Sequence, residues 1–250
     1  MKIKQEIPWY KNDYLRQKWI KQKSNHYVFY YLKNSLAEND IYKIIKLKEK
    51  HHNKILSFLD LKNKQIIHYY IYPSLKSKAS LMGDDSPGNV IWGDFELVNS
   101  EPKTNKFEIH TIYNDKCQFI GEHEDTHFLS LSLGLSIYLF CEGLAQFMEG
   151  NLFGKDIDII SKELLSQKKL YSIKNLIDNK NWEKVDSKII YPEVGSFVRF
   201  LINTYGWDKF KKTYQRLSRL NNSEENLKII ENGFEKSIEE LEKEWKGGLK

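Results

Sequence analysis

The spacing of hydrophobic residues changes about halfway along the 250-residue chain. In the first half, alternating aromatic and β-branched residues predict strands. These strands are expected at residues 26–32, 65–72 and 107–113. One helix is expected between the first two strands, because apolar residues recur at helical spacing from Ile41 to Leu59, with Asn39 as a plausible N-cap.

From about Phe119 onward, the hydrophobic spacing is helical almost to the end of the chain. Helices are expected at residues 119–133, 136–148, 156–165, 192–205, 207–220, 223–231 and 237–245. Gly134, Gly154 and Gly206 fall between these segments, where left-handed caps are common. Strands followed by helices predict an α+β fold. We expect one domain with a strand-rich lobe (residues 1–118, a small mixed sheet), a helical lobe (119–250) and an active site between them.

Composition excludes several classes of protein. The chain is 40% hydrophobic and 14% aromatic, which is too apolar and too aromatic for a disordered chain. The formal charge of +5 is carried almost wholly by lysine, and lysines such as Lys46, Lys48 and Lys50 are expected on solvated helix faces. Clustered arginines and a groove-reading element are absent from the sequence, so no nucleic-acid partner is predicted.

Other features bear on the cellular compartment. Cys117 and Cys141 are expected as two separate thiols, because one pair cannot form a disulfide framework. The first residues, Met1 to Tyr14, lack the apolar core of a signal peptide, which favours a cytoplasmic protein for the chain as given and leaves export from a trimmed chain open. The longest nearly uncharged run, Phe128 to Cys141, is shorter than the roughly 20 residues that span a bilayer, so no membrane span is expected.

Candidate chemistry lies in the sequence His123-Glu124-Asp125-Thr126-His127, an H-E-x-x-H motif inside a predicted helix. Residues four apart share one helix face, so both imidazoles can reach one metal ion. Glu124, one step around the helix, can accept a proton from a metal-bound water. The competing interpretation is a structural coincidence, which arises on the order of once in a hundred chains with this histidine content.

A third metal ligand is expected on the next helix. Glu142 is the only charged residue between Phe128 and Met148. A lone acid in an apolar helix is costly to bury unless it is paired or bound to a metal. Catalytic zinc usually takes three protein ligands and leaves one position open, so Glu142 is predicted to complete the set, with a satisfied structural carboxylate as the alternative.

The H-E-x-x-H followed by Glu142-Gly143-Leu144-Ala145 resembles the gluzincin metallopeptidases, which include thermolysin-like enzymes and related aminopeptidases. The run from Tyr191 to Gly206 and the C-terminal run from Gly233 to Trp245 resemble the later helices of the smaller peptidase MA-like members. The resemblance thus covers roughly residues 26–245. It implies a zincin-like fold, one zinc ion per chain and a peptide or protein substrate.

The resemblance also implies roles for single residues. It makes His123, His127 and Glu142 the zinc ligands and Glu124 the general base. Tyr191 matches the tyrosine that donates to the oxyanion in the related aminopeptidases, where it stands ahead of a glycine-containing helix start. The implied reaction is hydrolysis of a peptide bond by a zinc-activated water.

The chain departs from the gluzincin pattern at two places. Asp125 stands where a neutral or hydrophobic residue is usual, and we expect it to point to solvent. Gln146 stands where thermolysin-like enzymes place an acid that orients a zinc-bound histidine, a role that its amide oxygen can still fill. His110 lies in the strand before the zinc helix, where gluzincins offer an edge strand to substrate, and is expected to be a structural residue rather than a substrate contact.

The other histidines have ordinary interpretations. His51 and His52 are expected at the surface of a lysine-rich helix, and His26 and His68 at the edge of the core. A different class of function also stays open, namely a catalytically silent protein of the same fold that recognises a peptide or protein partner. The complete set of two histidines, one ligand glutamate and one base favours the enzyme.

Overall fold

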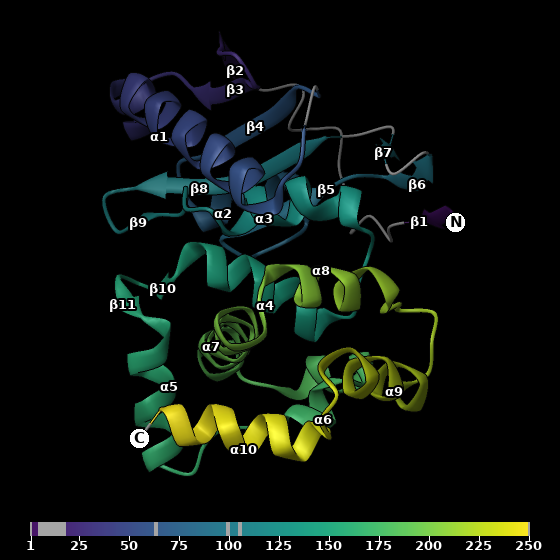
Figure 1. The fold of residues 1–250 in the computed structure, drawn as a ribbon. Helices are drawn as coiled ribbons and strands as arrows, with labels where there is room; N and C mark the ends of the chain where they lie inside the picture. Colours follow the sequence, from purple (N-terminus) through teal and green to yellow (C-terminus); the bar gives the residue numbers. More distant parts are fainter. Residues whose placement is uncertain (1, 5–18, 63–64, 99–100, 105–106, 250) are drawn as a thin grey trace. The chain divides into compact units, whose positions relative to one another are not determined.

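The computed structural model describes residues 2–4, 19–62, 65–98, 101–104 and 107–249. The chain divides into two compact units, Met1–Ser132 and Leu133–Lys250, and each is described by itself. Strands and helices mix in the first unit, and helices dominate the second (Figure 1). The described chain is therefore an α+β protein with an N-terminal sheet and a helical C-terminal part, as the sequence predicts.

The first unit holds a mixed sheet, a smaller sheet and three α-helices among its described residues. Its elements are β1 (Lys2–Lys4), β2 (Trp19–Lys23), β3 (Tyr27–Leu32), α1 (Leu36–Leu59), β4 (Ile67–Tyr72), α2 (Leu75–Met82), β5 (Gly88–Ile91), β6 (Asp94–Val98), β7 (Glu101–Thr104), β8 (Glu108–Asn114), β9 (Cys117–Gln118), α3 (His123–Leu129) and the 3-10 turn η2 (Ser130–Leu133).

The main sheet has the strand order β2-β3-β4-β8-β5, with β9 paired to the end of β8. The strands β3, β4 and β8 run parallel, whereas β2 and β5 are antiparallel to their neighbours. In the register, Tyr30 lies opposite Tyr70, and Tyr70 lies opposite His110. The strand β8 is therefore interior, and the short strand β5 forms one edge. The expectation that His110 lies in an edge strand is wrong, because β5 covers that side of β8.

Side chains of the main sheet alternate between two buried layers, as pleated strands require. One layer packs Tyr30, Tyr70 and Tyr72 with Leu81 and Met82 of α2. The opposite layer carries Tyr27, Phe29 and Tyr69, and α1 covers it. Because both faces of the main sheet are covered, the sequences of its strands are nearly continuous apolar runs rather than alternating apolar and polar residues.

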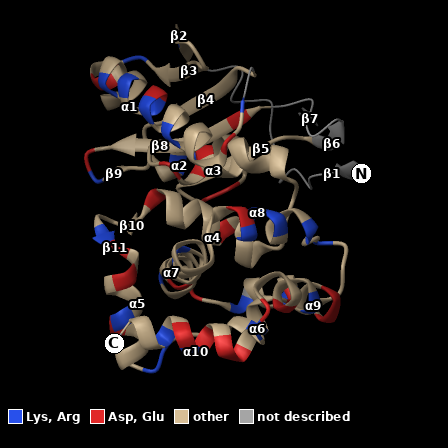
Figure 2. Ribbon diagram, in the orientation of Figure 1, with Lys and Arg blue, Asp and Glu red and all other residues tan. Residues whose placement is uncertain are grey.

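The helix α1 begins before the position that its spacing predicts. Ser35, not Asn39, is its N-cap, with the Ser35 hydroxyl accepting from the backbone N–H of Glu38. A serine cap with a glutamate three residues later resembles a capping box, and it adds a full turn to the helix. Both signs of charge lie along α1 in Figure 2. At the other end Asp60 takes the left-handed conformation that closes the helix.

The second unit is a bundle of helices with one short hairpin. Its elements are α4 (Tyr138–Glu149), β10 (Asn151–Leu152), β11 (Lys155–Asp156), α5 (Ile157–Ser166), α6 (Ile173–Leu176), η3 (Asn179–Lys184), α7 (Ser187–Tyr205), α8 (Trp207–Arg216), α9 (Ser223–Phe234) and α10 (Ile238–Gly248). None of the helices in the described ranges is long and apolar enough to cross a membrane.

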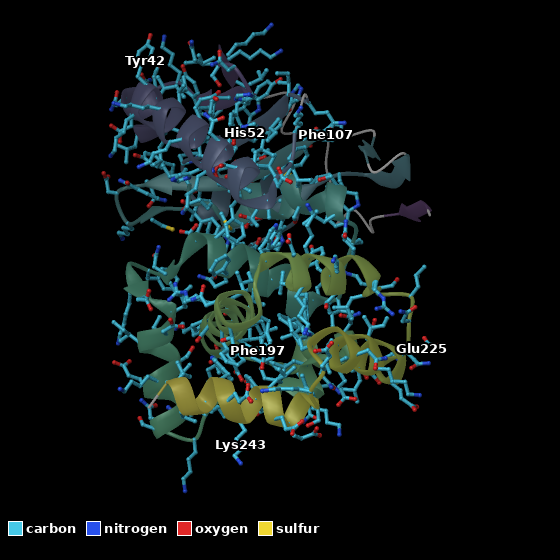
Figure 3. The ribbon with its side chains drawn as sticks, viewed as in Figure 1. Tyr42, His52, Phe107, Phe197, Glu225 and Lys243 are labelled. Atoms are coloured by element: carbon cyan, nitrogen blue, oxygen red, sulfur yellow. The ribbon has the colours of Figure 1, made fainter. Side chains whose placement is uncertain are left out.

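The central helix of this unit is α7, and α4 packs closely against it. An alanine Cβ at Gly143 of α4 would lie 2.9 Å from the carbonyl oxygen of Val194, and one at Gly195 of α7 would lie 2.7 Å from Cγ of Gln146. Both positions therefore need glycine for the two helices to meet. Phe197 of α7, labelled in Figure 3, lies inside the unit and packs edge-on against Trp245.

Several predicted helix boundaries are wrong for local reasons. Proline favours the first helical position, so Pro192 predicts a helix start, yet α7 begins at Ser187 behind the cap Asp186. The N-cap of α4 is Ile137, which makes no side-chain cap hydrogen bond. The predicted helix from Phe119 begins only at His123, because β9 and a turn come first.

Candidate metal centre

The H-E-x-x-H motif forms the short helix α3 of the first unit. His123 and His127 lie one turn apart, and their Nε2 atoms are 3.1 Å from each other. Two nitrogens bound to one tetrahedral zinc at about 2.0–2.1 Å are about 3.3 Å apart. The two imidazoles therefore already have the spacing that a shared zinc ion requires, and both are partly buried.

Glu124 lies next to the edge strand β5. Its side chain is buried, with 8% of its surface exposed. An alanine Cβ at Gly88 would lie 2.7 Å from Oε1 of Glu124 and 2.4 Å from Cε1 of Phe119. β5 thus lies beside the carboxylate that the sequence predicts to be the general base, and a side chain at position 88 would crowd it.

The prediction that Asp125 points to solvent is wrong. Its side chain has no exposed surface, and its Oδ1 accepts a 2.6 Å hydrogen bond from the hydroxyl of Tyr27. Its Oδ2 accepts from Nζ of Lys48, a lysine predicted to be solvated and in fact also fully buried. Burial by itself would lower the pKa of Lys48, but the neighbouring carboxylate outweighs burial and raises the pKa.

The position of Lys48 could have been predicted from the spacing of its neighbours. The buried positions of α1 include Ile41, Ile44, Ile55 and Leu59, and Lys48 falls on that same face. A lysine in the middle of an apolar stripe indicates a buried counter-ion rather than a solvated face.

His51 and His52 are buried too, contrary to the prediction that they lie at the surface. His52, labelled in Figure 3, stacks on His26 with 3.9 Å between the ring centroids. Burial lowers the pKa of both His51 and His52. A buried imidazole is cheaper to keep neutral than charged. His52 also packs edge-on against Tyr27 of β3 and so belongs to the packing between α1 and the sheet.

His110 is a fully buried residue in the sheet. Its ring stacks on Tyr70 at 4.7 Å, and its Nδ1 lies 2.9 Å from the hydroxyl of Tyr72. These contacts agree with the structural role that the sequence favours for it.

Cys117 and Cys141 are free thiols, also as predicted.

Glu142 lies on α4 of the second unit and is partly buried. Tyr138 lies one turn before Glu142, and Cζ of the Arg219 guanidinium lies over its ring, 4.1 Å from the ring centroid. Nε of Arg219 donates to the carbonyl of Ser136. The E-G-x-A sequence has a packing reason, since Gly143 lets α4 approach α7.

Among the described residues, His123, His127 and Glu142 form a group that could hold a metal ion. Two imidazole nitrogens and one carboxylate are the donor set of many catalytic zinc sites, and they leave one coordination position open. The chemistry of these residues therefore fits zinc.

Two further predicted residues lie in the second unit. Tyr191 is partly buried inside α7, not ahead of a helix start as the resemblance implies. Gln146 is buried, and its Nε2 donates to the carbonyl of Asn151 at 2.6 Å, which holds the β10–β11 hairpin to α4. That a zinc-bound histidine donates to the amide oxygen of Gln146 stays a prediction.

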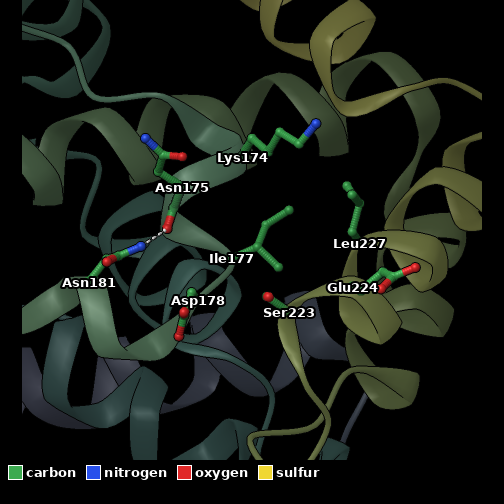
Figure 4. Close-up of a pocket in the computed structure, with 8 residues that line it drawn as sticks. All are labelled: Lys174, Asn175, Ile177, Asp178, Asn181, Ser223, Glu224 and Leu227. Atoms are coloured by element: carbon green, nitrogen blue, oxygen red, sulfur yellow. Dashed lines mark hydrogen bonds between the residues drawn. The ribbon is translucent and has the colours of Figure 1, made fainter.

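A pocket of about 330 Å³ opens in the second unit beside α6, η3 and α9. Figure 4 shows its lining, which is Lys174, Asn175, Ile177, Asp178, Asn181, Ser223, Glu224 and Leu227. None of these residues belongs to the predicted site, and Nζ of Lys174 donates to Glu239. The pocket adds no chemistry to the metal centre.

No family model and no curated protein matches the chain. Solved structures do match, among them a mutant of the M1 zinc metallopeptidase from Deinococcus radiodurans, with a TM-score of 0.46 and 10% sequence identity. That match covers 90% of this chain and 50% of the other, so the chain spans about half the length of that peptidase. A similarity of this size does not by itself assign an activity.

Proposed function

We propose that the chain is a zinc-dependent peptidase of gluzincin type. The observation that carries the proposal is the 3.1 Å separation of the His123 and His127 Nε2 atoms on one helix that also carries the buried Glu124. His123, His127 and Glu142 are the proposed ligands, in keeping with their grouping as a possible metal site. When bound, zinc would acidify a water molecule near neutral pH and polarise the carbonyl of the scissile bond.

The chain's own residues supply the remaining chemistry. Glu124 accepts the proton of the attacking water and returns it to the leaving amine as the peptide bond breaks. Gly88 of β5 leaves room beside this carboxylate, since an added Cβ at that position would lie 2.7 Å from its Oε1. Tyr191 is proposed to donate a hydrogen bond from its hydroxyl to the developing oxyanion, a role that the resemblance implies.

The test compares two neutral amide substitutions at the start of α3. Glu124→Gln is expected to retain zinc and lose turnover by at least about 100-fold, because general-base catalysis contributes roughly that much or more. The matched control is Glu122→Gln, which removes a carboxylate that binds Lys54 and is expected to keep turnover. Both variants are assayed with a peptide library and their zinc content is measured.

The outcomes separate the candidate functions. Full turnover in Glu124→Gln would contradict the proposed mechanism. Zinc-loaded wild-type protein that cleaves no peptide in a broad library would instead favour the silent binding module.

A further inference from the structure

The helix α1 presents two lysines and a histidine to the segment that begins α3. Lys48, His51 and Lys54 are spaced three residues apart and lie along one side of α1. Lys54 donates to Oε1 of Glu122 at 2.7 Å, and Nε2 of His51 lies 3.8 Å from the same oxygen. Lys48 lies deepest, because its side chain is fully buried while that of Lys54 is 51% exposed.

The ammonium of Lys48 contacts the chain on both sides of His123. Before the histidine, Nζ donates to the carbonyl of Gly121 at 2.8 Å and to that of Ile120 at 3.3 Å. After it, the same atom donates to the carboxylate of Asp125. One buried charge thus fixes the backbone that leads into α3 and a side chain in its first turn.

Asp125 has a second anchor in the sheet. The hydroxyl of Tyr27, at the start of β3, donates to Oδ1 of Asp125 at 2.6 Å. The carboxylate therefore binds to α1 through Lys48 and to the sheet through Tyr27. A rotation of α3 about its axis would break both interactions.

The helix α3 has little intrinsic means of holding its orientation. It has 7 residues, and its N-cap residue, Glu122, makes no side-chain cap hydrogen bond. Helices this short are marginal in water and depend on tertiary contacts. The orientation of His123 and His127 must then come from what α3 packs against.

We propose that Lys48, Asp125 and Tyr27 are positioning residues that set the metal affinity of the two histidines. The inference rests on the proposed zinc site, and it assigns a role to residues that touch neither metal nor substrate. It also accounts for an acid at position 125, where the gluzincin pattern has a neutral or hydrophobic residue. The carboxylate is the attachment point through which α1 and β3 orient the zinc helix.

The experiment removes the buried charges without leaving either one unpaired. Replacement of a buried ion pair by neutral groups is often tolerated by the fold, so Lys48→Met with Asp125→Asn is the principal variant. The amide oxygen that Asp125→Asn introduces would still accept from Tyr27. Zinc affinity is measured by competition with a chromophoric chelator, and urea unfolding verifies that the fold is intact.

A loss of 10- to 100-fold in zinc affinity is expected, the usual effect of removing groups that orient metal ligands. At saturating zinc, kcat is expected to fall while KM changes little, since no substrate contact is lost. The matched control is Lys54→Met, which removes the exposed contact to Glu122 and is expected to bind zinc as the wild type does.

If the double variant does not fold, a milder variant tests the same contact. Tyr27→Phe removes only the hydroxyl that binds Asp125 and is expected to weaken zinc binding several-fold. Folded variants with wild-type zinc affinity and kcat would overturn the inference. Wild-type protein that binds zinc but cleaves no peptide would refute the proposed peptidase function alone, because the affinity comparison does not depend on turnover.

Discussion

Two ion pairs, one from each unit, differ in how far solvent reaches them. In the first unit, Lys48 and Asp125 both have no exposed side-chain surface and bind each other. In the second, pairs such as Lys174 and Glu239 are more than half exposed, at 54% and 58%. Solvent screens the exposed pair, whereas loss of one member of the buried pair leaves the other buried without its partner.

One carboxyl group of the second unit is buried and makes no ion pair with any residue in the described part of the chain. Glu193 of α7 has no exposed surface, and its Oε2 accepts from the backbone N–H of Tyr171 at 3.1 Å. Its Oε1 has no hydrogen-bond partner among the described residues. Burial raises the pKa of Glu193 to about 8, so this carboxyl group keeps its proton at neutral pH. Asp125, in contrast, forms an ion pair with a lysine.

The comparison predicts that a buried ion pair costs most when one partner is lost. Lys48→Met leaves the carboxylate of Asp125 buried without its cation and is expected to destabilise the protein by about 3–5 kcal/mol. Urea unfolding at neutral pH measures this loss. Adding Asp125→Asn to the variant should recover much of it, and a double variant as unstable as the single one would contradict the assignment of the penalty to the unpaired charge.

The protonated carboxyl of Glu193 predicts a dependence of stability on pH. Its pKa in the folded protein, about 8, lies above the ordinary value of 4.5. Between these values the unfolded chain releases a proton that the folded protein keeps. Stability should therefore fall as the pH rises from about 4.5 through 8, by as much as about 1.4 kcal/mol for each pKa unit.

Glu193→Gln is the variant that isolates this effect, since an amide keeps the shape and cannot ionise. We expect its melting temperature to exceed that of the wild type at pH 9 and to differ little at pH 5. Melting curves of both proteins across this range provide the measurement. Parallel pH profiles would show that Glu193 does not titrate as its burial implies.

The exposed pair of the second unit is expected to give the smallest effect. Lys174→Met removes the 2.8 Å contact with Glu239, but solvent already screens both groups. We expect no measurable change in the unfolding midpoint. A loss as large as that of Lys48→Met would remove the distinction between the two kinds of ion pair.

The elements of the fold were easier to predict than their boundaries. The strands β3, β4 and β8 and the helix α1 follow directly from the spacing of aromatic and aliphatic residues, because burial fixes that spacing. The start of α1 did not follow, since Ser35 and Asn39 are both good caps and only the folded chain selects one. Pro192 misled in the same way, because proline can also lie inside a helix once a cap such as Asp186 begins it earlier.

The candidate site shows the same limit. The spacing of His123 and His127 predicted which atoms come together, because four residues make about one helical turn. The surroundings of Asp125 did not follow from its own sequence position, since Lys48 lies 77 residues away and reaches it through the packing of α1. The local motif thus predicts residues that could hold a metal ion, whereas the groups that contact Asp125 come from distant parts of the chain.

The most direct test of the central claim is the zinc content of the purified protein, measured by native mass spectrometry beside Glu142→Ala. The account predicts about one zinc per wild-type chain and a loss or strong weakening of binding in the variant. Wild-type protein that holds no zinc after loading and dialysis would contradict the claim that His123, His127 and Glu142 form a zinc site.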